Sequence, residues 1–111
     1  MPYISAEQVK TIRQRIKAVF PKFRFSIRKD NYAVVSVTVL SGPIAPPSSD
    51  LFNVNHFYIN DHYSEYPQWR KLLGTIKTII NDGNGGHHDG DYGFVPNWYT
   101  NIKISREYVT K

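Results

Sequence analysis

Apolar residues near the start of the chain change their spacing once, from a helical period to a strand period. Over residues 9–20 they recur at steps of three and four, which predicts an amphipathic helix. Ser5 and Gln8 have the spacing of a capping box, so we expect the helix to start there. Pro21 ends the helical pattern, and over residues 23–28 apolar and polar residues alternate as in a strand with one buried face. We therefore expect a helix that packs against a sheet.

Two further strands are expected before the middle of the chain. Residues 33–40 are rich in β-branched side chains and follow the turn residues Asp30 and Asn31, so they predict an antiparallel hairpin with the first strand. A third strand is expected over residues 52–59. Its apolar side chains change faces half-way along, which requires either a β-bulge or burial on both faces.

The second half of the chain contains another helical pattern and another strand. Pro67 opens a helix that continues to residue 80, and the alternation over residues 98–105 predicts a final strand. The order is αββ(β)αβ, in a single domain that covers residues 1–111. We therefore expect an α+β fold, in which a small antiparallel sheet of three to four strands carries two amphipathic helices on one face.

The residue types that are absent narrow the possible functions. The chain contains no cysteine, which excludes disulfides, thiolate zinc sites and cysteine nucleophiles. Its apolar stretches fall well short of the roughly 20 residues that a membrane-spanning helix needs, so we expect a cytoplasmic protein without membrane contact. The motifs GxSxG, HExxH, GxxxxGKS/T and GxGxxG are also absent. We therefore predict no cofactor, and binding is favoured over catalysis.

Positive charge is concentrated in the first third of the chain. The formal net charge is +5, and eight of the 14 Lys and Arg residues lie within the first 30 positions. Lys10, Arg13 and Lys17 form one stripe on the predicted helix, whereas Arg24 and Arg28 are expected on the sheet face that points away from the helices. These five residues are the candidate site for an alternative function, nucleic-acid binding. We expect the sheet to divide them into two patches.

Residues 52–69 contain more aromatic side chains than one strand and the first turn of one helix can readily bury. Tyr and Trp are enriched in the cores of protein interfaces, because each combines a large contact area with a polar group. The first hypothesis is therefore a surface for another macromolecule, formed by the aromatic strand and the Asp-Gly loop; the alternative is burial at two edges of one core. The candidate residues are His56, Tyr58, Tyr63, Asp89, Asp91, Tyr92 and Tyr99.

The Gly-rich loop over residues 82–93 contains several His and Asp residues, which are metal-ligand types. Its sequence does not fit an EF-hand, since His and Gly occupy positions that need Gly and Glu. A metal-dependent enzyme at this loop is the third hypothesis. Because five of the seven glycines lie here, ordering several ligands would cost much conformational entropy, and we expect weak or no metal binding. The candidate ligands are His87, His88, Asp89 and Asp91, with His56 or His62 from the neighbouring strand.

Three stretches carry a resemblance to a known family: YISAEQV at residues 3–9, NVNHFYI at residues 53–59 and DGDYGFVPNWY at residues 89–99. Together they resemble the large polyvalent protein-associated domain family, whose members occur in phages, prophages and conjugative plasmids. The resemblance covers nearly the whole chain and implies a mobile-element protein, with no assigned reaction. It makes the first hypothesis a non-catalytic interaction module that binds a host or element macromolecule, with a role such as counter-defence.

Overall fold

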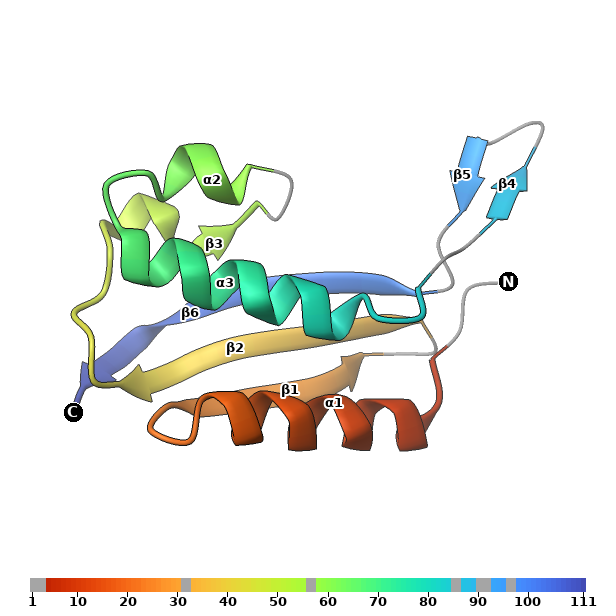
Figure 1. Ribbon diagram of the computed structural model, residues 1–111, viewed down its shortest axis with the longest axis horizontal. Coiled ribbons are helices and arrows are strands. Elements are labelled where there is room, and N and C mark those ends of the chain that lie inside the picture. Colours follow the sequence, from red (N-terminus) through yellow and green to blue (C-terminus); the bar gives the residue numbers. More distant parts are fainter. Residues whose placement is uncertain (1–3, 31–32, 56–57, 85–86, 90–92, 96–97) are drawn as a thin grey trace.

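The fold is a four-stranded sheet with helices over one of its faces (Figure 1). The computed structural model describes residues 4–30, 33–55, 58–84, 87–89, 93–95 and 98–111. The predicted α+β class is confirmed. The helices are α1 (Ala6–Val19), α2 (Ile59–His62) and α3 (Pro67–Ile80), with a 3-10 turn at Ser49–Leu51. The strands are β1 (Arg24–Asp30), β2 (Val34–Gly42), β3 (Asn53–Val54), β4 (His87–Asp89), β5 (Gly93–Val95) and β6 (Tyr99–Thr110).

Helix α1 begins and ends where the sequence pattern predicts. The Gln8 backbone N–H donates to Ser5 Oγ at 3.1 Å, and the Ser5 N–H donates to Gln8 Oε1 at 2.9 Å, which completes the predicted capping box. At the other end the Phe20 N–H still donates to the carbonyl of Ile16, and Pro21 follows. Helix α3 likewise starts with Pro67 in its first turn, where the missing N–H costs no hydrogen bond.

The main sheet has the strand order β1-β2-β6-β3 and is mixed. Strand β1 is antiparallel to β2, and β3 is antiparallel to β6, but β2 and β6 run parallel. The expectation of a wholly antiparallel sheet therefore fails at this one pair. Parallel neighbours need a long crossover connection, and the segment that contains α3 supplies it between β2 and β6.

The third strand is much shorter than the expected range of 52–59. Strand β3 contains only Asn53 and Val54, and helix α2 starts at Ile59. Ile59 and Tyr63 are both buried and lie four residues apart, which is the spacing of one face of a helix. The change of face in the sequence pattern falls at His56 and Phe57, which lie outside the described residues.

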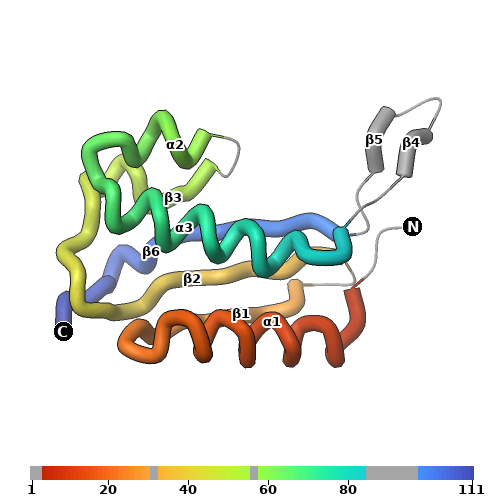
Figure 2. Tube along the Cα trace, in the orientation of Figure 1, coloured from red at the N-terminus to blue at the C-terminus, as the bar shows by residue number. Residues whose placement is uncertain are grey.

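In the part of the chain that the structure describes, helices cover one face of the sheet (Figure 1). Helices α1 and α3 lie side by side over that face (Figures 1 and 2), as the sequence predicted. Alternate residues of β2 and of the first half of β6 point into this core, including Val37 and Ile102. The residues between them stay exposed or half-buried on the opposite face, as at Thr38 and Lys103. Within the described residues, none of the helices has the length and apolar character needed to cross a bilayer.

Candidate functional site

Basic residues from α1 and β1 converge on an open groove with a volume of about 480 Å³ along the outer edge of the sheet. We call it the β1 groove. Because β1 is the first strand of the sheet, its outer backbone edge is not paired with another strand of that sheet. Its lining residues are Arg13, Lys17, Phe23, Arg24, Phe25, Ser26 and Ile27.

Arg13 holds the basic stripe of α1 against the edge of β1. Its guanidinium donates two hydrogen bonds to the carbonyl oxygen of Ile27, from Nε at 3.0 Å and from Nη2 at 2.8 Å. A carbonyl on an edge strand would otherwise need water or another chain as its partner. The bond thus fixes a positive charge beside the groove.

The sheet divides the five predicted basic residues, but not at the point that was expected. Arg24 lines the same groove as Arg13 and Lys17, whereas Arg28 lies four residues further along β1. The register of β1 against β2 shifts between Arg24 and Phe25, so a simple alternation of faces does not extend back to Arg24. Lys10 is exposed on α1 outside the groove lining. The structure therefore brings three of the five together.

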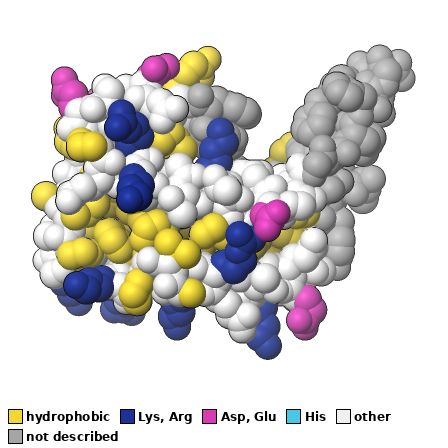
Figure 3. Space-filling model, in the orientation of Figure 1, with side chains coloured by type: hydrophobic (Ala, Val, Ile, Leu, Met, Phe, Trp, Pro, Cys, Tyr) yellow, Lys and Arg dark blue, Asp and Glu magenta, His cyan; other side chains and the backbone are white. Residues whose placement is uncertain are grey.

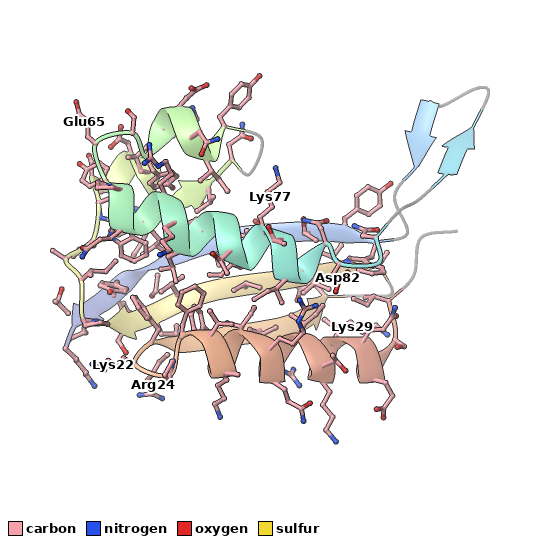
Figure 4. The ribbon with its side chains drawn as sticks, viewed as in Figure 1. Lys22, Arg24, Lys29, Glu65, Lys77 and Asp82 are labelled. Carbon is pink, nitrogen blue, oxygen red and sulfur yellow. The ribbon has the colours of Figure 1, made fainter. Side chains whose placement is uncertain are left out.

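Further positive charge surrounds the groove on the same side of the molecule. Figure 3 shows Lys and Arg side chains along the outer edge of α1, and Figure 4 shows Lys22 close to Arg24, where the chain passes from α1 into β1. Arg15 belongs to the other side of the helix, because its Nη1 pairs with Asp82 Oδ2 at 2.7 Å near the end of α3. The basic surface thus follows α1 and the start of β1.

The predicted aromatic surface separates into exposed and buried residues. Tyr58 is 53% exposed and Tyr99 is 49% exposed, so both are available to a partner. Tyr58 stacks on the His62 ring, with 5.7 Å between centroids. Tyr63 is 1% exposed and its hydroxyl donates to the carbonyl of Leu51, so it belongs to the core and offers no surface to a partner. Burial raises the pKa of Tyr63 to about 12.

Several predicted residues of the aromatic strand and of the His- and Asp-rich loop lie outside the described part of the chain. His56, Asp91 and Tyr92 are among them, and for His87, His88 and Asp89 only the backbone of β4 is described. The side chains whose placement is described contain no group of three or more His, Asp or Glu residues that could hold a metal ion.

Asn84 and Trp98 close the two ends of this loop. The Trp98 N–H donates to Asn84 Oδ1 and Asn84 Nδ2 donates to the Trp98 carbonyl, each at 2.9 Å. The Trp98 indole N–H also donates to the Ile80 carbonyl at 2.9 Å, which ties the loop base to the end of α3. Asn84 and Trp98 are therefore held together by both backbone and side-chain groups.

The family of the chain follows from its match to a family model. The model described as large polyvalent protein associated domain 29 matches residues 3–106. The chain belongs to this family. The resemblance found in the sequence is thus confirmed, and it extends over both α1 and β1, which form the groove of this polyvalent-protein domain. No curated protein and no solved structure matches the chain.

Sequence reasoning did not single out Lys103 and Arg106, which lie on β6 beside the uncovered sheet face. In the alternating pattern of the final strand, the side chain of Lys103 points to the face opposite that of Ile102 and Ile104. The sequence therefore did indicate that Lys103 is exposed. The neighbours of Lys103 across the sheet depend on strand order and register, which no local pattern specifies.

Proposed function

We propose that this domain is a binding module of a phage- or plasmid-type mobile element, and that it binds nucleic acid through the β1 groove. The observation that carries the proposal is the convergence of Arg13, Lys17 and Arg24, from two different elements, on one open groove. Nucleic acids present closely spaced phosphates, and clusters of Lys and Arg bind them mainly through charge. The membership of the polyvalent-protein family supports the mobile-element context.

The groove has the chemistry that a phosphate backbone requires. Lys17 and Arg24 are exposed and carry their charges at its rim, while Arg13 is fixed to the carbonyl of Ile27. Its apolar lining comes from Phe23 and Phe25, which are half-buried and stack on each other with 6.1 Å between centroids. Positively charged side chains beside two packed aromatic rings favour the binding of an extended anionic polymer over that of a small neutral ligand.

A protein partner is the second candidate, and Tyr58 is the observation that favours it. This side chain is half-exposed and its ring is held by the stack on His62, so little rotamer freedom is lost on binding. A host or mobile-element protein is the expected partner at this position. Replacing Tyr58 by Ala should then weaken that partner's binding while leaving nucleic-acid binding unchanged.

Charge reversal in the groove tests the main proposal. Lys17→Glu combined with Arg24→Glu should reduce the affinity for fluorescent oligonucleotides by about tenfold or more at low salt, since two phosphate contacts become repulsions. Lys71→Glu is the matched control, because Lys71 is exposed on α3 and does not line the groove. Circular dichroism and the melting temperature check that each variant is folded. Equal affinities of the wild type and the groove variant, or undetectable binding by both at low salt, would refute the proposal.

A further inference from the structure

The face of the sheet opposite the helices carries a continuous polar row across all four strands. Ser26 of β1 pairs with Thr38 of β2, Thr38 pairs with Lys103 of β6, and Lys103 pairs with Asn53 of β3. These four side chains line a shallow hollow of about 310 Å³ together with Leu40, Phe52, Ile104, Ser105 and Arg106. We call it the sheet-face hollow.

A second row beside it has the same character. Arg28 of β1 pairs with Ser36 of β2, and Ser36 pairs with Asn101 of β6. Arg28 and Asn101 are exposed. The Ser36 hydroxyl donates to the carboxylate of Asp30, which gives this acidic group on the same face a local hydrogen bond. The two rows therefore combine cations with hydroxyl and amide groups that both donate and accept hydrogen bonds.

An exposed aromatic ring lies on the same strand as Lys103. Tyr99 is 49% exposed and lies four positions before Lys103 on β6, so both side chains point to the same face. Four residues of a strand correspond to about 13 Å. Tyrosine rings on a sheet surface are suited to stack on unpaired bases, whose π-faces are accessible only when the strand is single.

The sheet-face hollow and the β1 groove meet at Ser26, which lines both. A ligand that fills both surfaces must bend around the edge strand within the width of one β-strand. Double-stranded DNA resists such bending, because its persistence length is about 150 base pairs. A single strand bends freely at each nucleotide and also exposes the base edges that hydroxyl and amide groups recognise.

From this continuity we propose that the uncovered sheet face binds single-stranded nucleic acid that enters from the β1 groove and crosses β1 at Ser26. Lys103 and Arg28 contact phosphates, Thr38 and Asn53 contact base edges, and Tyr99 stacks on a base. The inference rests on the proposed function, since the β1 groove supplies the first phosphate contacts. To the proposed function it adds that the ligand is single-stranded and that a second surface of the domain binds it.

The test compares single-stranded and duplex oligonucleotides on matched variants. Fluorescence anisotropy measures the binding of oligo-dT, oligo-U and a mixed-sequence duplex to the wild type, to the groove variant Lys17→Glu with Arg24→Glu, and to the face variant Arg28→Glu with Lys103→Glu. Tyr99→Ala is measured as well, with Lys71→Glu as the control. The wild type should bind a single strand more tightly than the duplex, and the oligo-dT and oligo-U arms show whether DNA or RNA is preferred.

The face variant should lose about tenfold or more in affinity for single strands and retain its weak duplex affinity, and Tyr99→Ala should weaken single-strand binding alone. If the face variant and Tyr99→Ala bind single strands as tightly as the wild type while the groove variant does not, the inference fails and the proposed function stands. If the groove variant also binds as the wild type does, the proposed function fails. Equal weakening of single-strand and duplex binding by the face variant would overturn the assignment of strandedness.

Discussion

Replacing Tyr63 by Phe should make the stability of the protein less sensitive to alkaline pH. Burial raises the pKa of the Tyr63 hydroxyl from its ordinary value of 10.0 to about 12, because the ionised form loses its hydration in the core. The folded-state pKa is above the unfolded-state pKa. The contribution of this group to stability is therefore fully present below about pH 10 and is lost as the pH rises through about 12. A difference of about two pKa units corresponds to roughly 3 kcal/mol.

Urea denaturation followed by circular dichroism measures this effect. The free energy of unfolding of the wild type should fall relative to that of Tyr63→Phe by roughly 2 kcal/mol between about pH 9 and pH 12. Burial also raises the pKa of Tyr108, but this residue is present in both proteins, so its effect cancels in the difference. At neutral pH the variant should lose about 1 kcal/mol, from the hydrogen bond to the Leu51 carbonyl. A difference between the two proteins that stays constant with pH would refute the placement of Tyr63 in the core.

Three further substitutions test how the core and the loop base are held. Gly42→Ala should destabilise the fold by about 1–3 kcal/mol, because a Cβ at Gly42 would overlap the ring of Phe23, and a lowered urea midpoint checks this. Asn84→Ala should cost about 1–3 kcal/mol through its lost hydrogen bonds to the Trp98 backbone, and faster limited proteolysis between these two residues should accompany it. Ser5→Ala should cost about 1 kcal/mol and Ser5→Gly much less, as expected of an N-cap residue; equal melting temperatures of both variants and the wild type would contradict the capping role.

The parts of the fold that depend on local spacing could be predicted from the sequence. Helices α1 and α3 were predictable because their apolar residues repeat at a helical period and because Ser5 and Pro67 mark their starts. The direction of β6 could not be predicted, since a parallel pairing with β2 depends on how the intervening segment crosses the sheet. The apolar pattern over residues 52–59 predicts a single strand, because a short strand followed by a short helix leaves an ambiguous pattern.

The candidate site was predictable only in part, for the same physical reason. The stripe on α1 that includes Arg13 and Lys17 follows from helical spacing alone. The presence of Arg24 in the same groove depends on a register shift in β1, and the row from Ser26 to Asn53 depends on the order and register of four strands. Both depend on contacts between distant segments, which the pattern of neighbouring residues does not specify. Burial of Tyr63 likewise depends on packing between distant segments, such as its contact with Leu51.

The salt dependence of oligonucleotide binding tests the central claim most directly. For a single strand, the logarithm of the affinity falls with the logarithm of the salt concentration with a slope of about −0.7 per phosphate contact. The three cations of the β1 groove give a slope of about −2, and the addition of Arg28 and Lys103 gives about −3.5. We predict a wild-type slope within this range, and a slope shallower by about 1.4 for Lys17→Glu with Arg24→Glu. A flat salt dependence, or the same slope in the wild type and this variant, would contradict the account.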